Sequence, residues 1–221
     1  MIITLDGPSG SGKSTLSKQI AKEYGLIHID SGAIYRTIAY YFNKNKLSKD
    51  QYINSLDDID IFYKKNGVTL DGKLLKNEIR TSEITELASK ISAIPEIRDK
   101  VNNIIRAIAN KTSVVVDGRD IGSVVLPNAD YKFYIDASIE KRARRRLNQM
   151  RRKNILNNKS FNEIYSEIEQ RDKRDMSRKL DPLTIPEGAF IINTSDKKIK
   201  DSIKQINQII RGNNENHIKH S

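Results

Sequence analysis

A glycine-rich segment near the start of the chain has the residue types and spacing that bind phosphate groups. Residues Gly7–Ser14 fit the pattern G-x-x-x-x-G-K-[ST] and directly follow the short apolar run Ile2–Leu5. Glycines let the backbone bend closely around an anion, so that successive N–H groups and the start of the next helix point toward it. We expect Lys13 to be an exposed loop residue that reaches the β- and γ-phosphates, and Ser14 to bind Mg²⁺. The residues assigned to the triphosphate are Gly7, Pro8, Ser9, Gly10, Ser11, Gly12, Lys13, Ser14 and Thr15.

Carboxylates at the ends of other predicted strands supply further chemistry. Asp30 follows the apolar stretch 26–29, and Asp117 ends the β-branched run Val114–Val116. Because the carboxyl ends of parallel strands meet at one edge of a sheet, we expect both to share a crevice with Asp6. We interpret Asp117 as a carboxylate that reaches the metal ion, directly or through water, while pairing with a neighbouring arginine remains the alternative.

Several arginines can hold a second phosphate group in the same crevice. Arg36 lies in the first turns of a predicted helix, where a cation opposes the helix dipole, so we expect it to face an anion. Arg119 follows Asp117 closely, and residues 171–178 hold three more arginines. Arginine binds phosphate groups through two parallel hydrogen bonds, which suits it to this task.

The basic run 141–146, extended by residues 151–153, has two interpretations. It can be a nucleic-acid surface, or it can be a lid of two charged helices joined by a flexible segment, residues 154–158. Such a lid would close cations over a transferring phosphoryl group and exclude water. No aromatic residue for base stacking lies in the run, which favours the lid. Some of these arginines must still be ordinary solvated surface.

The composition excludes several classes of protein. The chain has 221 residues, a formal net charge of +11 and no cysteine, so it can form neither a disulfide framework nor a thiolate metal site. No signal segment or long apolar run is evident, so we expect a cytoplasmic protein without a membrane segment. The excess of positive charge fits either a nucleic-acid surface or a site for several phosphates.

Hydrophobic periodicity predicts strands that alternate with helices. The expected core strands cover residues 2–5, 26–30, 113–117, 131–136 and 189–193. The expected helices cover residues 13–24, 83–94 and 137–153, with four more opened by Ser31, Pro95, Ser160 and Asp196. Glu163 completes a capping box with Ser160. This alternation predicts an α/β fold with a five-stranded parallel sheet and helices on both faces.

Two parts of the chain interrupt this alternation. Residues 59–79 combine short alternating runs with turns at Asn66–Gly67 and Asp71–Gly72, which predicts a small antiparallel β-meander inserted on the main sheet. Beyond Arg211 the polar tail 212–221 has nothing to bury, and we expect it to be disordered.

The three histidines receive no role. His28 lies in an apolar strand, where a lone histidine is most often structural. His217 and His220 could bind a metal ion weakly, but a solvated tail explains them better.

The motifs together resemble the bacterial cytidylate kinases, which are nucleoside-monophosphate kinases of the P-loop class. The matching segments are residues 6–15, residues 30–36 with the sequence DSGAIYR, residues 117–122 with the sequence DGRDIG, and the arginine cluster 171–178. With the meander, the resemblance covers the chain from Ile2 to about Arg211. The second and third segments are much more specific than the phosphate loop.

The resemblance implies a P-loop NTPase fold of three layers, with the inserted meander lobe and a short helical lid. It implies a single kinase domain whose core is 1–30, 111–140 and 185–211, with a monophosphate-binding region 31–110 that holds the insertion near 57–100. The lid and the following Arg-rich helix are then residues 141–180. The implied activity is phosphoryl transfer from ATP, with Mg²⁺, to CMP or dCMP.

The resemblance also implies roles for individual residues. Ser31, Arg36 and Arg119 would hold the CMP phosphate. Ser89, Arg98, Asp120 and Arg178 would address the cytosine, and Arg171 and Asp175 would meet the ribose hydroxyls. Lys13, Arg119 and Arg174 are the expected catalytic cations, and Ser14 and Asp117 the expected metal ligands. An acceptor phosphate oxygen is already ionised near neutral pH, so no general base is assigned.

The sequence departs from the family pattern at two positions and leaves alternatives open. Some relatives have glycine where this chain has Ser14, and an apolar residue is common where it has Asp181. A kinase of the same fold acting on UMP, dTMP or shikimate is the nearest alternative, followed by a nucleic-acid-binding ATPase. A GTP switch would need Asn-Lys-x-Asp, which is missing. We expect a monomer with small-molecule substrates and no specific nucleic acid.

Overall fold

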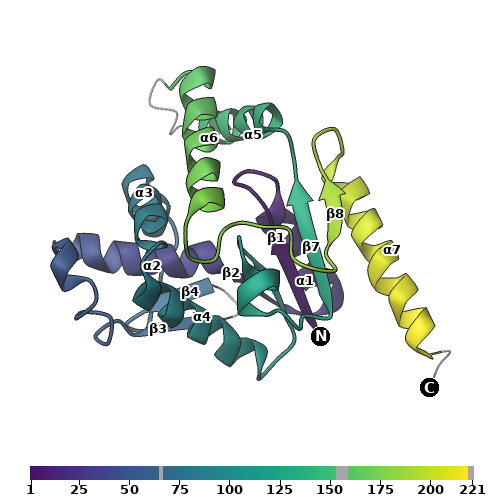
Figure 1. Cartoon of the computed structure of the whole chain (residues 1–221), viewed down its shortest axis with the longest axis horizontal. Coiled ribbons are helices and arrows are strands. Elements are labelled where there is room, and N and C mark those ends of the chain that lie inside the picture. Colours follow the sequence, from purple (N-terminus) through teal and green to yellow (C-terminus); the bar gives the residue numbers. More distant parts are fainter. Residues whose placement is uncertain (65–66, 153–158, 219–221) are drawn as a thin grey trace.

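A five-stranded parallel sheet forms the centre of the molecule (Figure 1). The computed structural model describes residues 1–64, 67–152 and 159–218. The strands lie in the order β2–β6–β1–β7–β8, and every neighbouring pair is parallel. Their bounds are β1 Ile2–Asp6, β2 Ile27–Asp30, β6 Val114–Asp117, β7 Tyr131–Asp136 and β8 Phe190–Asn193. The predicted sheet is therefore confirmed.

Both faces of the sheet are covered, because its central strands direct apolar side chains to each face. Val114 and Val116 join the hydrophobic cluster on one face, and Val115 joins the cluster on the other. The helices α1 (Lys13–Tyr24) and α7 (Ile199–Ile218) cover the second face. Gly25 ends α1 in the left-handed conformation, as its sequence position predicts.

The first face carries the larger hydrophobic cluster, which joins the sheet to a helical region. That region contains α2 (Ser31–Lys44), α3 (Ser82–Ile91) and α4 (Pro95–Ala109), together with the π-helical turn η3 (Ile121–Val125). α3 ends three residues before the predicted end at Ile94, because Pro95 begins the next helix instead.

The predicted meander is a separate three-stranded antiparallel sheet. Its strands are β3 (Ile61–Lys64), β4 (Gly67–Leu70) and β5 (Lys73–Leu74), in that order. The turn between β4 and β5 uses the left-handed conformation at Asp71 and Gly72. Asn66, at the other predicted turn, lies outside the described residues. Val68 and Leu70 bury their side chains in the cluster below α2, which attaches the insertion to the main fold.

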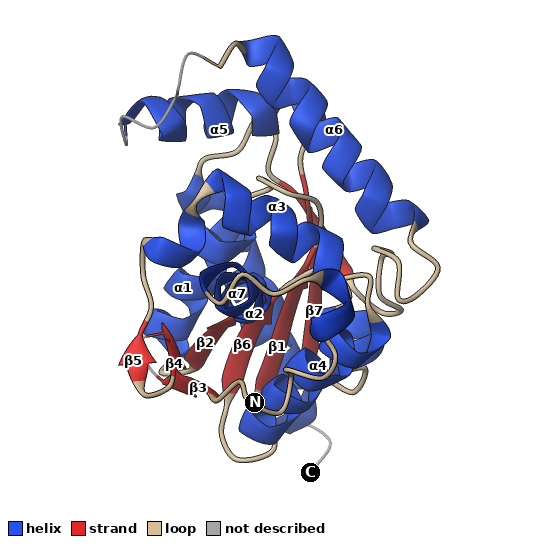
Figure 2. Ribbon diagram, turned by 90° about the vertical axis from the view of Figure 1, so that its left-hand side faces the viewer, coloured by secondary structure: helices blue, strands red, loops and turns tan. Residues whose placement is uncertain are grey.

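Two helices lie over the carboxyl ends of the strands (Figure 2). They are α5 (Ile139–Arg152) and α6 (Phe161–Ser177), and they share a small core of Ala143, Met150, Ile164 and Ile168. α6 begins with the predicted capping box, in which the Ser160 hydroxyl accepts from the Glu163 N–H. The connecting segment 154–158, predicted to be flexible, lies outside the described residues.

The C-terminal helix differs from the sequence expectation. α7 continues through Gly212 to Ile218, a stretch that we predicted to be disordered. Extending an existing helix adds one hydrogen bond per residue without the cost of nucleation, so a polar tail can continue it. Residues 219–221, and with them His220, lie outside the described part. None of the described helices is long and apolar enough to cross a membrane.

Candidate active site

Three strand ends meet at one edge of the sheet, as the sequence predicts. The register places Asp30 beside Asp117, and Leu5 beside Asp117 from the other side. Asp6 follows Leu5 and is fully buried, where its carboxylate accepts from the N–H groups of Ile121 at 2.8 Å and Gly122 at 2.7 Å. Burial raises the pKa of Asp6 to about 6, against the effect of these two hydrogen bonds. The edge therefore positions both the phosphate loop and the turn η3.

The phosphate loop depends on glycine at two positions. Gly7 has φ of 141°, and a Cβ atom there would lie 2.1 Å from the carbonyl oxygen of Ile135 in β7. Gly12 precedes α1 with φ of 102°, and a Cβ atom there would meet nothing within 4 Å. The first glycine lets the loop pack against the sheet, and the second leaves open space at the start of the helix.

Lys13 is buried, so the expectation of an exposed loop lysine is wrong. Its side chain curls back into the loop and donates to the carbonyl oxygens of Gly7 at 2.6 Å and Pro8 at 2.7 Å. Burial, followed by repulsion from Arg119, holds its pKa well below the usual range, although Asp117 and Asp6 act in the opposite direction. The ammonium group is therefore held at the centre of the loop by carbonyl oxygens.

The two predicted metal ligands lie together. Ser14 Oγ donates to Asp117 Oδ2 at 2.6 Å, across 103 residues of sequence. The other oxygen of Asp117 lies 2.5 Å from His28 Nε2. His28, to which we gave no role, therefore orients the carboxylate. Its position two residues before Asp30 was the available signal, because alternate strand residues share a face of the sheet.

The arrangement fits a magnesium ion that takes most of its ligands from elsewhere. A hydroxyl and a carboxylate are the hard oxygen ligands that Mg²⁺ prefers, and this ion commonly keeps waters and phosphate oxygens as its remaining ligands. Within the described ranges there is no group of three or more His, Cys, Asp or Glu side chains that could hold a metal ion by themselves. Ser14 and Asp117 can thus anchor an ion that arrives with a triphosphate.

Residues around the start of α2 form the next part of the site. Arg36 Nη2 forms an ion pair with Asp30 Oδ2 at 2.8 Å, and Arg80 lies 3.6 Å from the same oxygen. Ser31 donates from its hydroxyl to the Asp117 carbonyl at 2.8 Å. Arg36 Nε is buried and has no hydrogen-bond partner. One donor of this arginine is therefore available to an anion.

Arg119 and Arg171 approach the same region from β6 and α6. Arg119 Nε pairs with Asp175 Oδ2 at 2.8 Å. Arg171 Nε is buried without a partner. Burial, together with repulsion from Arg119 and Arg36, lowers the pKa of Arg171 to about 10, although Asp175 acts to raise it. For Asp175, burial alone would raise the pKa, but Arg119 and Arg171 outweigh it and the net pKa lies below its ordinary value.

The residues implied for the base form a second cluster. Arg98 is 1% exposed and pairs through Nη2 with Asp120, whose other oxygen lies 3.1 Å from Arg178 Nη2. Burial raises the pKa of Asp120, and the two arginines counteract it. Arg98 also donates to the Ser92 carbonyl at 3.1 Å, at the end of α3. Ser89, one turn earlier, has a buried hydroxyl without a hydrogen-bond partner.

The lid arginines divide into different environments. Arg174, which we expect to be catalytic, is exposed on α6, and its charge acts to lower the pKa of Glu86. Arg146 on α5 does repel Arg171. Three other arginines of α5 have partners within the protein: Arg142 with Asp172, Arg144 with Glu140, and Arg145 with Thr194.

Arg142 connects the lid to the phosphate loop, a role that sequence reasoning missed. Its buried guanidinium pairs with Asp172 of α6 at 2.5 Å and donates to the Ser9 carbonyl at 3.0 Å. Asp172 in turn accepts from the Ser9 N–H at 3.3 Å. A Cβ atom at Gly10 would lie 3.3 Å from the Cβ of Arg142. Arg142, in the first half of the basic run, therefore contacts the phosphate loop.

Comparison with known sequences identifies the family. The sequence model of the family described as cytidylate kinase matches residues 3–212. A cytidylate kinase of Caldanaerobacter subterraneus subsp. tengcongensis is 40% identical over 219 residues, which cover 98% of this chain and 97% of the relative. The chain belongs to the cytidylate kinase family. A second relative, the cytidylate kinase of Pseudothermotoga lettingae, is 40% identical over 209 residues, with 94% and 93% of the two chains covered.

Solved structures of other kinases share the fold of this cytidylate kinase family member. A shikimate kinase from Bacteroides thetaiotaomicron has a TM-score of 0.51 at 15% identity, with 96% of this chain and 98% of that chain covered. A gluconokinase from Sinorhizobium meliloti has a TM-score of 0.52 at 14% identity, with coverages of 99% and 96%. At such identities the likeness shows the fold alone, and it confirms the predicted P-loop kinase architecture.

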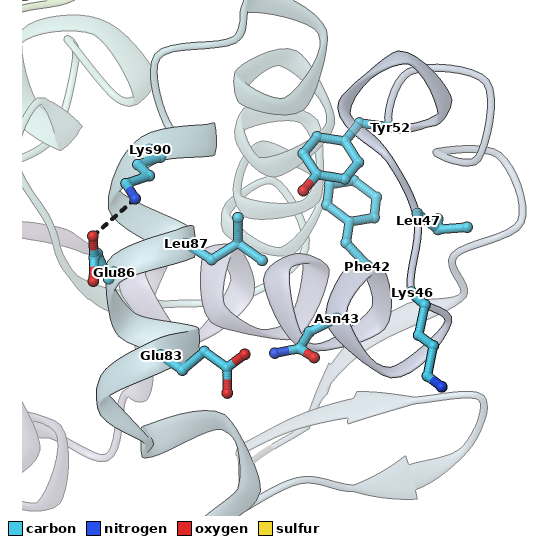
Figure 3. A pocket seen from close by; sticks show the side chains of 9 residues that line it. All are labelled: Phe42, Asn43, Lys46, Leu47, Tyr52, Glu83, Glu86, Leu87 and Lys90. Atoms are coloured by element: carbon cyan, nitrogen blue, oxygen red, sulfur yellow. Dashed lines mark ion pairs between the residues drawn. The ribbon is translucent and has the colours of Figure 1, made fainter.

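A hollow of about 390 Å³ in this cytidylate kinase family member lies away from the predicted site (Figure 3). It opens between the end of α2 and the outer face of α3, where Phe42 stacks on Tyr52 with ring centroids 4.1 Å apart. The predicted site residues do not line it.

Proposed function

We propose that the protein transfers the γ-phosphoryl group of ATP to CMP or dCMP, giving ADP and CDP or dCDP. The observation that carries this proposal is the group of cations formed by Lys13, Arg36, Arg119 and Arg171. Repulsion from Arg119 lowers the pKa of both Lys13 and Arg171, beyond the effect of burial. Buried cations that repel one another without full compensation form a site for anions.

The geometry supports two phosphate positions within this group. The loop around Lys13 and the start of α1 suits the donor triphosphate. Arg36 of α2 and Arg171 of α6 each have a buried Nε without a hydrogen-bond partner. Together with Ser31 and Arg119, they would hold the acceptor phosphate, and Arg171 and Asp175 would also meet the ribose hydroxyls.

The second cluster supports a base that offers both donors and acceptors. Asp120 can accept from an exocyclic amino group, and Arg98 and Arg178 can donate to a ring nitrogen and a carbonyl. The unpaired Ser89 hydroxyl is a further candidate for this edge. Cytosine presents these groups, whereas uracil replaces the amino group by a carbonyl and the ring acceptor by an N–H. Each mispaired buried group costs about 1–3 kcal/mol, so two or three suffice for strong preference.

During phosphoryl transfer, side chains of the protein would position the two substrates and neutralise the negative charge of their phosphate groups. Lys13 would balance the charge on the β- and γ-phosphates, and Arg119 would lie beside the acceptor oxygen. Ser14 and Asp117 would hold Mg²⁺, which supplies further charge neutralisation when it is bound. The lid helices exclude water from the crevice, and the ionised acceptor oxygen needs no general base.

We further propose that the enzyme works as a cytoplasmic monomer on small molecules without a specific nucleic acid. The contacts of the basic run support this proposal, because Arg142 and Arg145 use their guanidinium groups within the protein. The chain has no cysteine, so its stability does not depend on disulfide bonds, which is consistent with a reducing compartment such as the cytoplasm.

A coupled assay of ADP release across the common nucleoside monophosphates tests the proposal. We expect turnover with CMP and dCMP, weak turnover with UMP and dTMP, and none with shikimate. The variant Lys13→Met should stay folded and lose almost all turnover, which shows that the activity belongs to this protein. Equal turnover with UMP, or normal turnover of Lys13→Met, would contradict the proposed reaction.

A further inference from the structure

Asp181 contacts a buried cation, although it lies outside the motifs that point to the site. Its Oδ2 accepts from Arg98 Nε at 2.8 Å, across 83 residues of sequence. Arg98 comes from α4 in the monophosphate-binding region, whereas Asp181 lies in the segment between α6 and β8. The contact therefore connects the chain that leaves the lid to the cluster implied for the base.

The backbone around Asp181 is held in place on both sides. Its carbonyl oxygen accepts from Arg178 Nε at 2.5 Å, and the N–H of Leu183 donates to the Asp175 carbonyl at 2.8 Å. Asp181 itself has a positive φ of 47°, a conformation that aspartate adopts more readily than most residues. The carboxylate is thus delivered to Arg98 by a fixed backbone.

With Asp181, all three nitrogens of the Arg98 guanidinium have a partner. Nε is bound by Asp181, Nη2 by Asp120 and Nη1 by the Ser92 carbonyl. The side chain is 1% exposed, so its orientation is set by these contacts rather than by water. Removing the partner of Nε would leave a buried donor unpaired and let the guanidinium turn.

The net charge of the cluster also indicates that Asp181 is needed beside Arg98. Arg98 and Arg178 are balanced by Asp120 and Asp181, which gives a formally neutral group of four. With an apolar residue at 181, the same cluster would carry one uncompensated positive charge. A neutral base would then have to cover a buried cation that it cannot neutralise, which costs binding energy.

We propose that Asp181 is a positioning residue for acceptor recognition, which holds Arg98 in the orientation that reads the base. This inference rests on the proposed function, since it assumes that Arg98 faces the acceptor base. Asp181 acts through Arg98, so its loss should affect the acceptor and leave the donor site unchanged.

The experiment compares steady-state kinetics of Asp181→Ala, Asp181→Asn and a matched control, Asp71→Ala. Asp71 also has a positive φ, of 51°, but lies exposed in the turn of the meander. It therefore reproduces the backbone effect without touching Arg98. We expect Asp181→Ala to raise KM for CMP about tenfold, the effect of one lost hydrogen bond to a charged group. Asp181→Asn should recover part of this loss, and Asp71→Ala should match the parent.

A merely structural role would not reproduce three further readouts. KM for ATP and kcat should stay within about twofold of the parent, because the phosphate loop is untouched. The ratio of kcat/KM for CMP over UMP should fall about tenfold. In an Arg98→Met background, Asp181→Ala should cause no further change, since the two residues act as one unit.

The outcomes separate this inference from the function on which it rests. A parent enzyme that treats CMP and UMP alike would overturn the proposed function, whatever the variants do. A parent that prefers CMP, with the same KM and the same preference in Asp181→Ala, would overturn the role of Asp181 alone. Equal loss of turnover with CMP and UMP, or an unchanged effect in the Arg98→Met background, would also overturn it.

Discussion

Replacing Gly7 by alanine should destabilise the protein more than a left-handed conformation alone can explain. A Cβ atom at Gly7 would lie 2.1 Å from the Ile135 carbonyl oxygen, and 3.1 Å from its carbonyl carbon. The first distance is more than 1 Å short of a van der Waals contact of about 3.5 Å. Ile135 belongs to β7, which pairs with β1 in the sheet, so it cannot move away without disturbing that pairing.

The magnitude has two parts. A non-glycine residue in a positive-φ conformation costs about 1–2 kcal/mol. Forcing an extra carbon into a packed position costs about 1–3 kcal/mol more. Gly7→Ala should therefore lower the free energy of unfolding by about 2–5 kcal/mol. Because the Gly7 carbonyl also accepts from Lys13 Nζ at 2.6 Å, the shift should raise KM for ATP as well.

Gly188→Ala provides the control for the conformational part. Gly188 has φ of 70°, and a Cβ atom there would meet nothing within 4 Å. Urea denaturation followed by circular dichroism gives the free energy of unfolding of both variants. We expect Gly7→Ala to be about 1–3 kcal/mol less stable than Gly188→Ala. Equal stabilities would refute the steric reasoning, and an unchanged KM for ATP would refute the link from Gly7 to Lys13.

Two further predictions follow from the charges of the site. The charge of Arg146 acts on Arg171 in the cation group. We expect Arg146 to assist the transfer through that group, so Arg146→Ala should lower kcat about 10²-fold, whereas Arg144→Ala, which loses its pair with Glu140 and its contact with the Phe161 ring, should match the parent in turnover. Equal effects of the two substitutions in single-turnover measurements would contradict this assignment. The pKa of Asp6 is raised from 3.8 to about 6 in the folded protein, so its contribution to stability is greatest below pH 3.8 and is lost as pH rises through 6. The free energy of unfolding of the parent, measured against Asp6→Asn, should fall by roughly 2–3 kcal/mol between pH 4 and pH 7, and a pH-independent difference would contradict the raised pKa.

The sequence was sufficient for features that depend on local pattern. The phosphate loop follows a strand, the capping box at Ser160 forms as predicted, and the β-branched run 114–116 is buried on both faces. The pairing of Ser14 with Asp117 was also predictable, because a motif and a strand end determine both positions. Periodicity and motif spacing determine such features before any tertiary contact is known.

The features that sequence reasoning missed depend on contacts that neither a motif nor a periodicity specifies. Arg142 was one of several arginines in a basic run, and nothing local distinguished it as the partner of Asp172. The burial of Lys13 depends on the carbonyl oxygens of its own loop, which a motif does not display. His28 meets Asp117 because β2 and β6 are neighbours, so its position on the same face as Asp30 was only part of the signal, and the strand order supplies the rest.

The direction of the pKa shift distinguishes two kinds of buried cation in the site. Some are neutralised by acidic groups of the protein, and others are not. Burial acts to lower the pKa of Arg98 and of Arg119, but the effect of nearby acidic groups is larger, and the net pKa of each is raised. In Lys13 and Arg171 burial and repulsion prevail, and the net pKa is lowered. The free protein therefore carries unfavourable interactions at these two groups, and a bound phosphate group would relieve them.

The uncompensated positive charge at Lys13 and Arg171 should make ligand binding depend on salt concentration. A ligand that binds only the folded protein adds about 2.7 kcal/mol of stability at a concentration 100 times its Kd. An anionic ligand relieves the repulsion on Lys13 and Arg171, and this relief is part of its Kd, so its affinity must fall as salt screens the charges. The base cluster around Arg98 is already balanced, so the affinity that it contributes should depend little on salt. The phosphate groups of a substrate would thus supply the salt-dependent part of binding, and its base the salt-independent part.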